Sequence, residues 1–79
     1  MPEKVQAYVF VDTTNPGPKR VVGELRGIPG IVRADALFGV PDNIALVEGH
    51  DVAAFDSVID RIAELDGVID TESKVVRWV

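Results

Sequence analysis

An α+β fold with the element order β-α-β-β-α-β is predicted by three features of the sequence. Segments of alternating, β-branched residues come first, third, fourth and last along the chain, as expected for strands. Two segments with apolar residues at helical spacing lie between them. Near the middle, residues 38–43 (FGVPDN) combine Gly, Pro, Asp and Asn, which favour a turn. The strands on either side are therefore expected to form an antiparallel hairpin.

The first half of the chain is predicted to form a strand, a helix and a second strand. Residues 4–12 alternate between two largely apolar faces, which is typical of a central strand. Pro18 suits a first helical turn, where its missing N–H is not needed, so a helix is expected from there to about Arg26. Residues 31–38 are predicted to follow as a strictly alternating strand.

The second half repeats this order. Residues 43–49 form the next predicted strand, and Asp51 is a good N-cap for a helix over residues 52–65. Residues 68–79 form the last predicted strand, whose polar middle is typical of a sheet edge or a binding site. Seven positions between Val21 and Val32 recur at a constant offset in the second half, which indicates a doubled β-α-β unit.

Right-handed crossovers place both helices of such a unit on one face of a four-stranded antiparallel sheet, the ferredoxin-like arrangement. The other face stays uncovered, and Tyr8 and Phe10 are expected to lie on it. Burying a large apolar side chain contributes about 1.5–3 kcal/mol. We therefore predict a homodimer in which two sheets pack face to face, with Tyr8 and Phe10 in the interface.

Composition excludes several classes of function. The chain has 79 residues, enough for a single domain over residues 1–79. It has no cysteine and one histidine, His50, so no metal site or cofactor is expected. The net charge is −5 and the basic residues are scattered, which argues against direct contact with nucleic acid. No apolar run is long enough to cross a membrane and no signal peptide precedes the first strand, so we expect a cytoplasmic protein.

Three motifs in the expected order resemble a known family. They are LRGIPGIV at 25–32, FGVPD at 38–42 and LDGVIDTES at 65–73. Together they are similar to the C-terminal effector-binding (RAM-type) domain of the Lrp/AsnC family of feast/famine transcription regulators. The resemblance covers essentially the whole chain. Members of the family usually begin with a helix-turn-helix domain, so the chain is expected to be a stand-alone effector-binding domain that lacks this DNA-binding part.

The resemblance implies a site and an assembly. In that family the domains pair as a dimeric α/β barrel, dimers often associate into rings such as an octamer or a decamer, and the effector is usually an amino acid. Carried over to this sequence, the effector would bind the loop of Gly39, Val40, Pro41 and Asp42, with hydroxyl groups from Thr71 and Ser73. The chain departs from the family at Pro41, which removes one N–H donor, and at Ser73, where the family often has Thr.

The function expected from these features is a module that senses a small molecule, an amino acid by resemblance, and modulates transcription through full-length Lrp/AsnC regulators as partners. Three alternatives stay open. One is an ACT-like amino-acid-binding module, which would pair its sheets side by side. Another is a small enzyme on a dimeric α/β barrel, for which only His50, Asp12 and Asp35 offer a base. The last is an oligomerisation module without a ligand.

Overall fold

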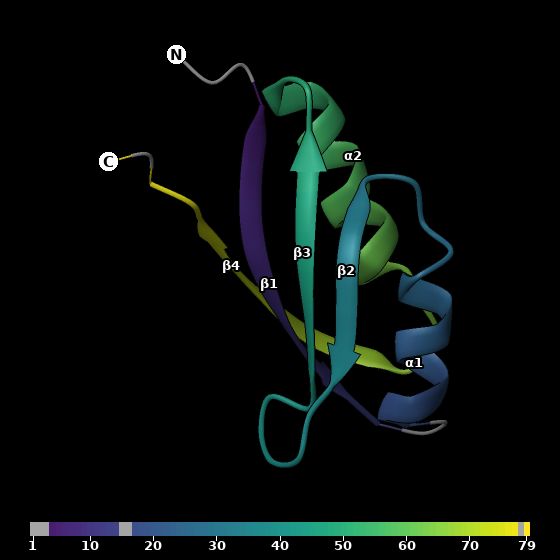
Figure 1. Ribbon diagram of the computed structural model, residues 1–79. Coiled ribbons are helices and arrows are strands. Elements are labelled where there is room, and N and C mark those ends of the chain that lie inside the picture. The colour runs from purple at the N-terminus through teal and green to yellow at the C-terminus, as the bar shows by residue number, and fades with distance from the viewer. Residues whose placement is uncertain (1–3, 15–16, 78) are drawn as a thin grey trace.

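The computed structural model describes residues 4–14, 17–77 and 79 of the chain. Its elements are β1 (Val5–Thr13), α1 (Pro18–Leu25), β2 (Ile31–Ala36), β3 (Asn43–Gly49), α2 (Val52–Ala63) and β4 (Val68–Val75). This order confirms the predicted ferredoxin-like βαββαβ fold (Figure 1). None of the helices in the described ranges is long and apolar enough to cross a membrane.

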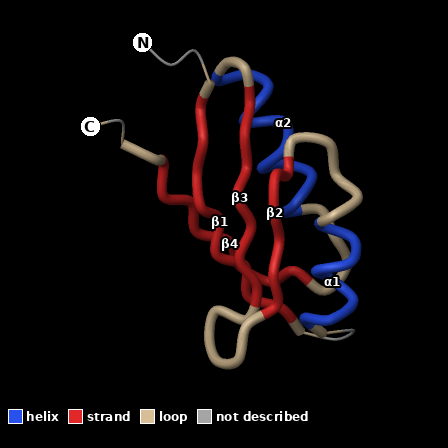
Figure 2. The backbone as a smooth tube through the Cα atoms, in the orientation of Figure 1, coloured by secondary structure: helices blue, strands red, loops and turns tan. Residues whose placement is uncertain are grey.

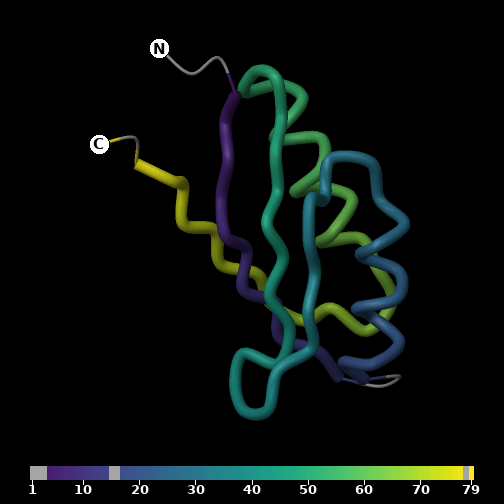
Figure 3. The backbone as a smooth tube through the Cα atoms, in the orientation of Figure 1, coloured from purple at the N-terminus to yellow at the C-terminus, as the bar shows by residue number. Residues whose placement is uncertain are grey.

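The four strands form one antiparallel sheet in the order β2-β3-β1-β4. Both helices lie on the same face of the sheet, and the other face has no layer over it in the described chain (Figure 2). The first and last strands lie side by side although they are far apart in sequence (Figure 3). The two halves of the chain are therefore interleaved, as a doubled β-α-β unit requires.

The face of the sheet beneath the helices is largely buried and mostly apolar. The inward side chains of β1, namely Ala7, Val9 and Val11, are completely buried. They belong to one cluster with Leu25 of α1 and Ile62 of α2, which are also completely buried. Because each large apolar side chain removed from water contributes about 1.5–3 kcal/mol, this cluster supplies most of the stability of the fold.

The start of α2 is fixed by a cap and by a close approach to β3. Asp51 caps the helix as predicted, since its Oδ1 accepts a hydrogen bond from the backbone nitrogen of Ala54 at 2.8 Å. A Cβ atom added to Gly49 would lie 2.5 Å from the backbone nitrogen of Phe55. Only glycine therefore allows the end of β3 to come this close to the first turns of α2.

The strict alternation predicted for residues 31–38 is wrong at both ends. Ile31 pairs with Val47 but Arg33 pairs with Leu46, so Val32 is the extra residue of a β-bulge. The bulge turns Ile31 toward the helices, where it packs against the core.

Two predicted strands also extend too far along the chain. β2 ends at Ala36 instead of residue 38. Just after this end, the backbone nitrogen of Leu37 donates to the carbonyl of Asp42 at 2.8 Å and closes a hairpin loop. β4 ends at Val75 instead of residue 79. Leu37 and Phe38 continue the sequence pattern of a strand, but β3 begins opposite Ala36 and offers them no partner. Beyond β4, the backbone nitrogen of Val76 still donates to the carbonyl of Gln6 of β1 at 2.8 Å.

Candidate functional site

The connection between β2 and β3, residues 37–42, projects beyond the end of the sheet (Figure 2). Gly39 adopts φ +114°, a conformation that favours glycine, and the Val40–Pro41 peptide bond is cis. The side chains of Phe38 and Val40 are almost fully exposed. The tip of this loop is therefore apolar and open to a ligand or to another molecule.

The base of the loop is rich in oxygen acceptors. Thr13 donates from its hydroxyl to Oδ2 of Asp42 at 2.8 Å, and Nδ2 of Asn43 lies 3.5 Å from Oδ1 of Asp42. Asn43 is completely buried, and its Oδ1 has no hydrogen-bond partner among the described residues. A buried acceptor without a partner costs about 1–3 kcal/mol. The sequence did not indicate the contact between Thr13 and Asp42, because the two residues are 29 positions apart.

Thr71 and Ser73 lie on the helix side of β4. Thr71 pairs with Val11 and Ser73 pairs with Val9, whose side chains face the helices. Val11 also pairs with Asn43 on its other side, so Thr71 lies two strand spacings, or about 10 Å, from the base of the loop. Ser73 lies one row further along the sheet. The structure thus brings Thr71 closer to the loop than Ser73.

Tyr8 and Phe10 lie on the face of the sheet that the helices leave uncovered. Tyr8 is 47% exposed. Two rows of cross-strand partners run over this face, Arg33-Leu46-Tyr8-Lys74 and Asp35-Ile44-Phe10-Glu72. Each row is apolar in the middle and charged at both ends. The uncovered face is therefore an apolar strip with an ion pair on each edge of the sheet.

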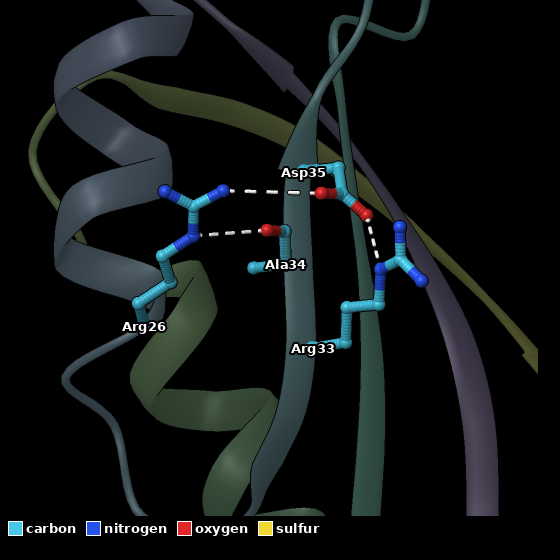
Figure 4. A network of polar contacts seen from close by, with 4 residues as sticks. All are labelled: Arg26, Arg33, Ala34 and Asp35. Carbon is cyan, nitrogen blue, oxygen red and sulfur yellow. Dashed lines mark hydrogen bonds and ion pairs between the residues drawn. The ribbon is translucent and has the colours of Figure 1, made fainter.

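A hollow of about 290 Å³ lies on this uncovered face, lined by Tyr8, Arg33, Asp35, Ile44 and Leu46. Arg33 Nε contacts Oδ2 of Asp35 at 2.8 Å (Figure 4). The sequence motifs did not indicate a ligand site here, although Arg33 and Asp35 lie two positions apart in the sequence. That spacing puts both side chains on one face of a strand and is the signal that could have found them.

Arg26 reaches β2 from the end of α1 (Figure 4). Its Nε donates to the carbonyl of Ala34 at 3.0 Å, and its Nη2 lies 3.8 Å from Oδ1 of Asp35. β2 is an edge strand, so this carbonyl lies on the outer side of the sheet. Arg26 therefore covers part of the edge and brings a second positive charge to Asp35.

Glu48 lies on the same uncovered face, one row beyond Tyr8. Gln6 donates from Nε2 to Oε2 of Glu48 at 2.8 Å, and Lys4 Nζ lies 3.1 Å from Oε1. The hydrogen bond from Gln6, followed by the contacts with Lys4, holds the pKa of Glu48 below the ordinary value of a glutamate. The carboxylate is therefore charged at neutral pH.

The residues that could act as a catalytic base are not brought together. His50 follows the end of β3 and its side chain is 82% exposed, whereas Asp35 pairs with Ile44 near the start of β3. Six positions along a strand separate them by roughly 20 Å. Asp12 lies opposite Asp70 on β4. Among the residues the structure describes, no group of three or more His, Cys, Asp or Glu is placed to hold a metal ion.

The sequence matches one family model. The model is described as the Lrp/AsnC ligand binding domain, and it matches residues 6–77 of the chain. No curated protein matches the sequence significantly.

Solved structures share the fold. A protein from Thermus thermophilus is 24% identical, with a TM-score of 0.85 over 95% of both chains. AsnC of Escherichia coli is 16% identical, with a TM-score of 0.84 over 99% of this chain and 54% of its own. A transcriptional regulator from Neisseria meningitidis, solved in complex with L-Met, is 26% identical, with a TM-score of 0.76 over 94% of this chain and 50% of its own. The chain thus spans about half the length of these two regulators.

Proposed function

Because it belongs to the Lrp/AsnC ligand-binding domain family, the chain is a ligand-sensing regulatory module and not an enzyme, and we propose that its ligand is an amino acid. The similar regulator from Neisseria meningitidis was solved with L-Met, which supports this class of ligand. An amino acid presents an ammonium group and a carboxylate. A site for it needs a charged acceptor and several N–H donors within one small volume.

The loop between β2 and β3 supplies both kinds of group. The Asp42 carboxylate pairs with the ligand ammonium, and the backbone N–H groups of Gly39 and Val40 bind its carboxylate. Pro41 shapes the loop without donating. The hydrogen bond from Thr13 to Asp42 is the observation that supports this site best, because it fixes the Asp42 carboxylate at the base of an exposed loop. When a second copy of the chain packs beside the loop, Thr71 and Ser73 contribute hydroxyl groups to the binding site.

The uncovered face of the sheet binds a second copy of the chain, which gives the dimeric α/β barrel. Tyr8 and Phe10 occupy the centre of the apolar strip, where burial contributes most. The ion pairs on the two edges limit the interface to the strip between them. Dimers then associate into a ring, an octamer or a decamer, in which the exposed loops meet.

Regulation of transcription is carried by partners. The net charge of −5 makes this chain a poor ligand for nucleic acid, so we place DNA binding on full-length Lrp/AsnC regulators that associate with it. Residues 1–79 act as one domain for effector binding and oligomerisation. The amino acid controls which partners the ring accepts.

A thermal-shift screen against the twenty amino acids at millimolar concentration tests this proposal. A ligand present at about 100 times its Kd stabilises the folded state by about 2.7 kcal/mol, which raises Tm by about 11–22 °C in a domain of this size. One amino acid or a small group should give such a shift. A screen with no shift for any amino acid would contradict the proposed ligand class.

Two variants assign the site. Asp42→Asn removes the charge and leaves an oxygen that can still accept from Thr13, so the fold is retained while the shift is lost. Asp56→Ala changes an exposed acid on α2, far from the loop in sequence, and should keep the full shift. A full shift in Asp42→Asn would exclude the loop as the site.

A further inference from the structure

The hollow on the uncovered face carries a pair of opposite charges beside an apolar floor. Its floor is made by Ile44 and Leu46 of β3 and by the ring of Tyr8 on β1. Arg33 and Asp35 of β2 form its wall, and their side chains are 77% and 38% exposed. An apolar amino acid has a carboxylate, an ammonium group and an apolar side chain. The guanidinium, the carboxylate and the apolar floor of the hollow complement these three parts in one place.

We propose that this hollow is a binding site for a zwitterionic amino acid with an apolar side chain, with Arg33 binding its carboxylate, Asp35 binding its ammonium group, and Ile44 and Leu46 receiving its side chain. The site is distinct from the loop of residues 39–42. It rests on the proposed function only in taking an amino acid as the ligand.

The charged contacts in the hollow leave room for both ligand groups. Arg33 contacts Asp35 through Nε, so the two outer nitrogens of its guanidinium can form the paired hydrogen bonds that a carboxylate prefers. Oδ1 of Asp35 lies 3.8 Å from Nη2 of Arg26, beyond hydrogen-bond distance, and can accept from an ammonium group. Arg26 faces Asp35 from the other side (Figure 4).

A second copy of the chain completes the site. A pocket usually buries most of its ligand, which a hollow on an open sheet face cannot do by itself. When another sheet covers this face, the apolar side chain of the ligand is enclosed between the two sheets. Binding in the hollow is therefore linked to pairing of the sheets, and the ligand should tighten the dimer.

The other edge of the same face offers matched controls. Lys74 and Glu72 of β4 lie in the same two rows as Arg33 and Asp35, and they contact each other at 3.9 Å. No residue of β4 lines the hollow. Lys74→Gln and Glu72→Gln therefore remove the same charges from the same face without touching the proposed site.

The experiment is calorimetric titration of the purified chain with L-methionine, L-leucine and L-phenylalanine, with the dimer Kd measured by sedimentation equilibrium. We expect at least one of the three to bind and to lower the dimer Kd. In an Asp42→Asn background, which removes the proposed loop site, Arg33→Gln and Asp35→Asn should each weaken the remaining binding at least tenfold, as loss of a hydrogen bond between charged groups does. Lys74→Gln and Glu72→Gln, made in the same Asp42→Asn background, should leave the affinity of the hollow within about twofold.

The outcomes separate this inference from the proposed function. Loss of binding in Asp42→Asn with full binding in Arg33→Gln assigns the amino acid to the loop and overturns the hollow. Binding only of polar amino acids in the wider screen overturns the hollow and keeps amino-acid sensing. No binding of any amino acid overturns both. Methionine methyl ester and the α-hydroxy analogue of methionine, each lacking one charge, should bind at least tenfold more weakly, and equal affinity for either would contradict the assigned contacts.

Discussion

The two faces of the sheet are built from the same strands but differ in what surrounds them. On the covered face, Val9 and Val11 of β1 are completely buried beneath the helices. On the uncovered face, Tyr8 of the same strand is 47% exposed and stands in a row with charged ends. Because side chains alternate along a strand, neighbouring residues of β1 lie on opposite faces of the sheet and in different surroundings. The covered face holds the core of the fold, and the uncovered face is where we propose that the chain pairs and binds a ligand.

The largest expected difference between the faces is in the free energy of unfolding that is lost when one leucine on each face is replaced by alanine. Leu25→Ala should lower the free energy of unfolding by about 2–5 kcal/mol, because Leu25 is completely buried and its loss leaves a cavity. Leu46→Ala, the same change in the uncovered hollow, should lower it by about 1 kcal/mol in dilute protein and raise the dimer Kd instead. Urea denaturation and sedimentation equilibrium measure the two effects. Equal losses at both positions, independent of protein concentration, would remove the distinction between the faces.

A smaller effect tests how closely the helices fit the covered face. Gly49→Ala should lower the free energy of unfolding by about 1–3 kcal/mol, since the new Cβ would overlap the backbone of α2 at Phe55. Gly23→Ala is the matched control, because Gly23 lies in α1 with nothing within 4 Å of its Cβ position. That change should raise stability by about 0.5–1 kcal/mol through helix propensity. A loss at Gly23 as large as at Gly49 would mean that both helices are packed equally tightly.

The smallest expected effect concerns pH and the uncovered face. The pKa of Glu48 is lower in the folded chain than in the unfolded chain, where a glutamate titrates near about pH 4.3. This contact therefore stabilises the fold above about pH 4.3, and the stabilisation is lost as pH falls through the lowered pKa. Gln6→Ala removes the largest cause, so its Tm should lie below that of the wild type at pH 7, and the two should converge as pH falls below the lowered pKa of Glu48. In a Glu48→Gln background, the same change should give a Tm difference that does not depend on pH.

The order of elements and the division of β1 into two faces could be predicted because both depend on local patterns. The same is true of the cap at Asp51, which requires only a polar residue before an apolar helix. The end of β2 could not be predicted, since Leu37 and Phe38 continue the strand pattern and only the missing partner on β3 stops it. The bulge at Val32 depends on register with Val47 and Leu46, which no local pattern contains.

The candidate sites differ in the same way. The loop of residues 39–42 is visible in the sequence because turn chemistry marks it. The anchoring of Asp42 by Thr13 depends on a contact between distant residues. The hollow needs three strands side by side, with β2 and β3 in a register that places Arg33 beside Leu46 and Asp35 beside Ile44. Sequence spacing shows that the two charges share a face, but only the sheet supplies their apolar floor.

Arg26 has a consequence for how the protein behaves when it is concentrated. A bare edge strand is a template on which the strand of another molecule can add, and repeated addition leads to fibres. On β2 a guanidinium already occupies the carbonyl of Ala34, so an incoming strand must first displace it and strip water from a charge. A single side chain thus makes growth of the sheet in that direction less favourable.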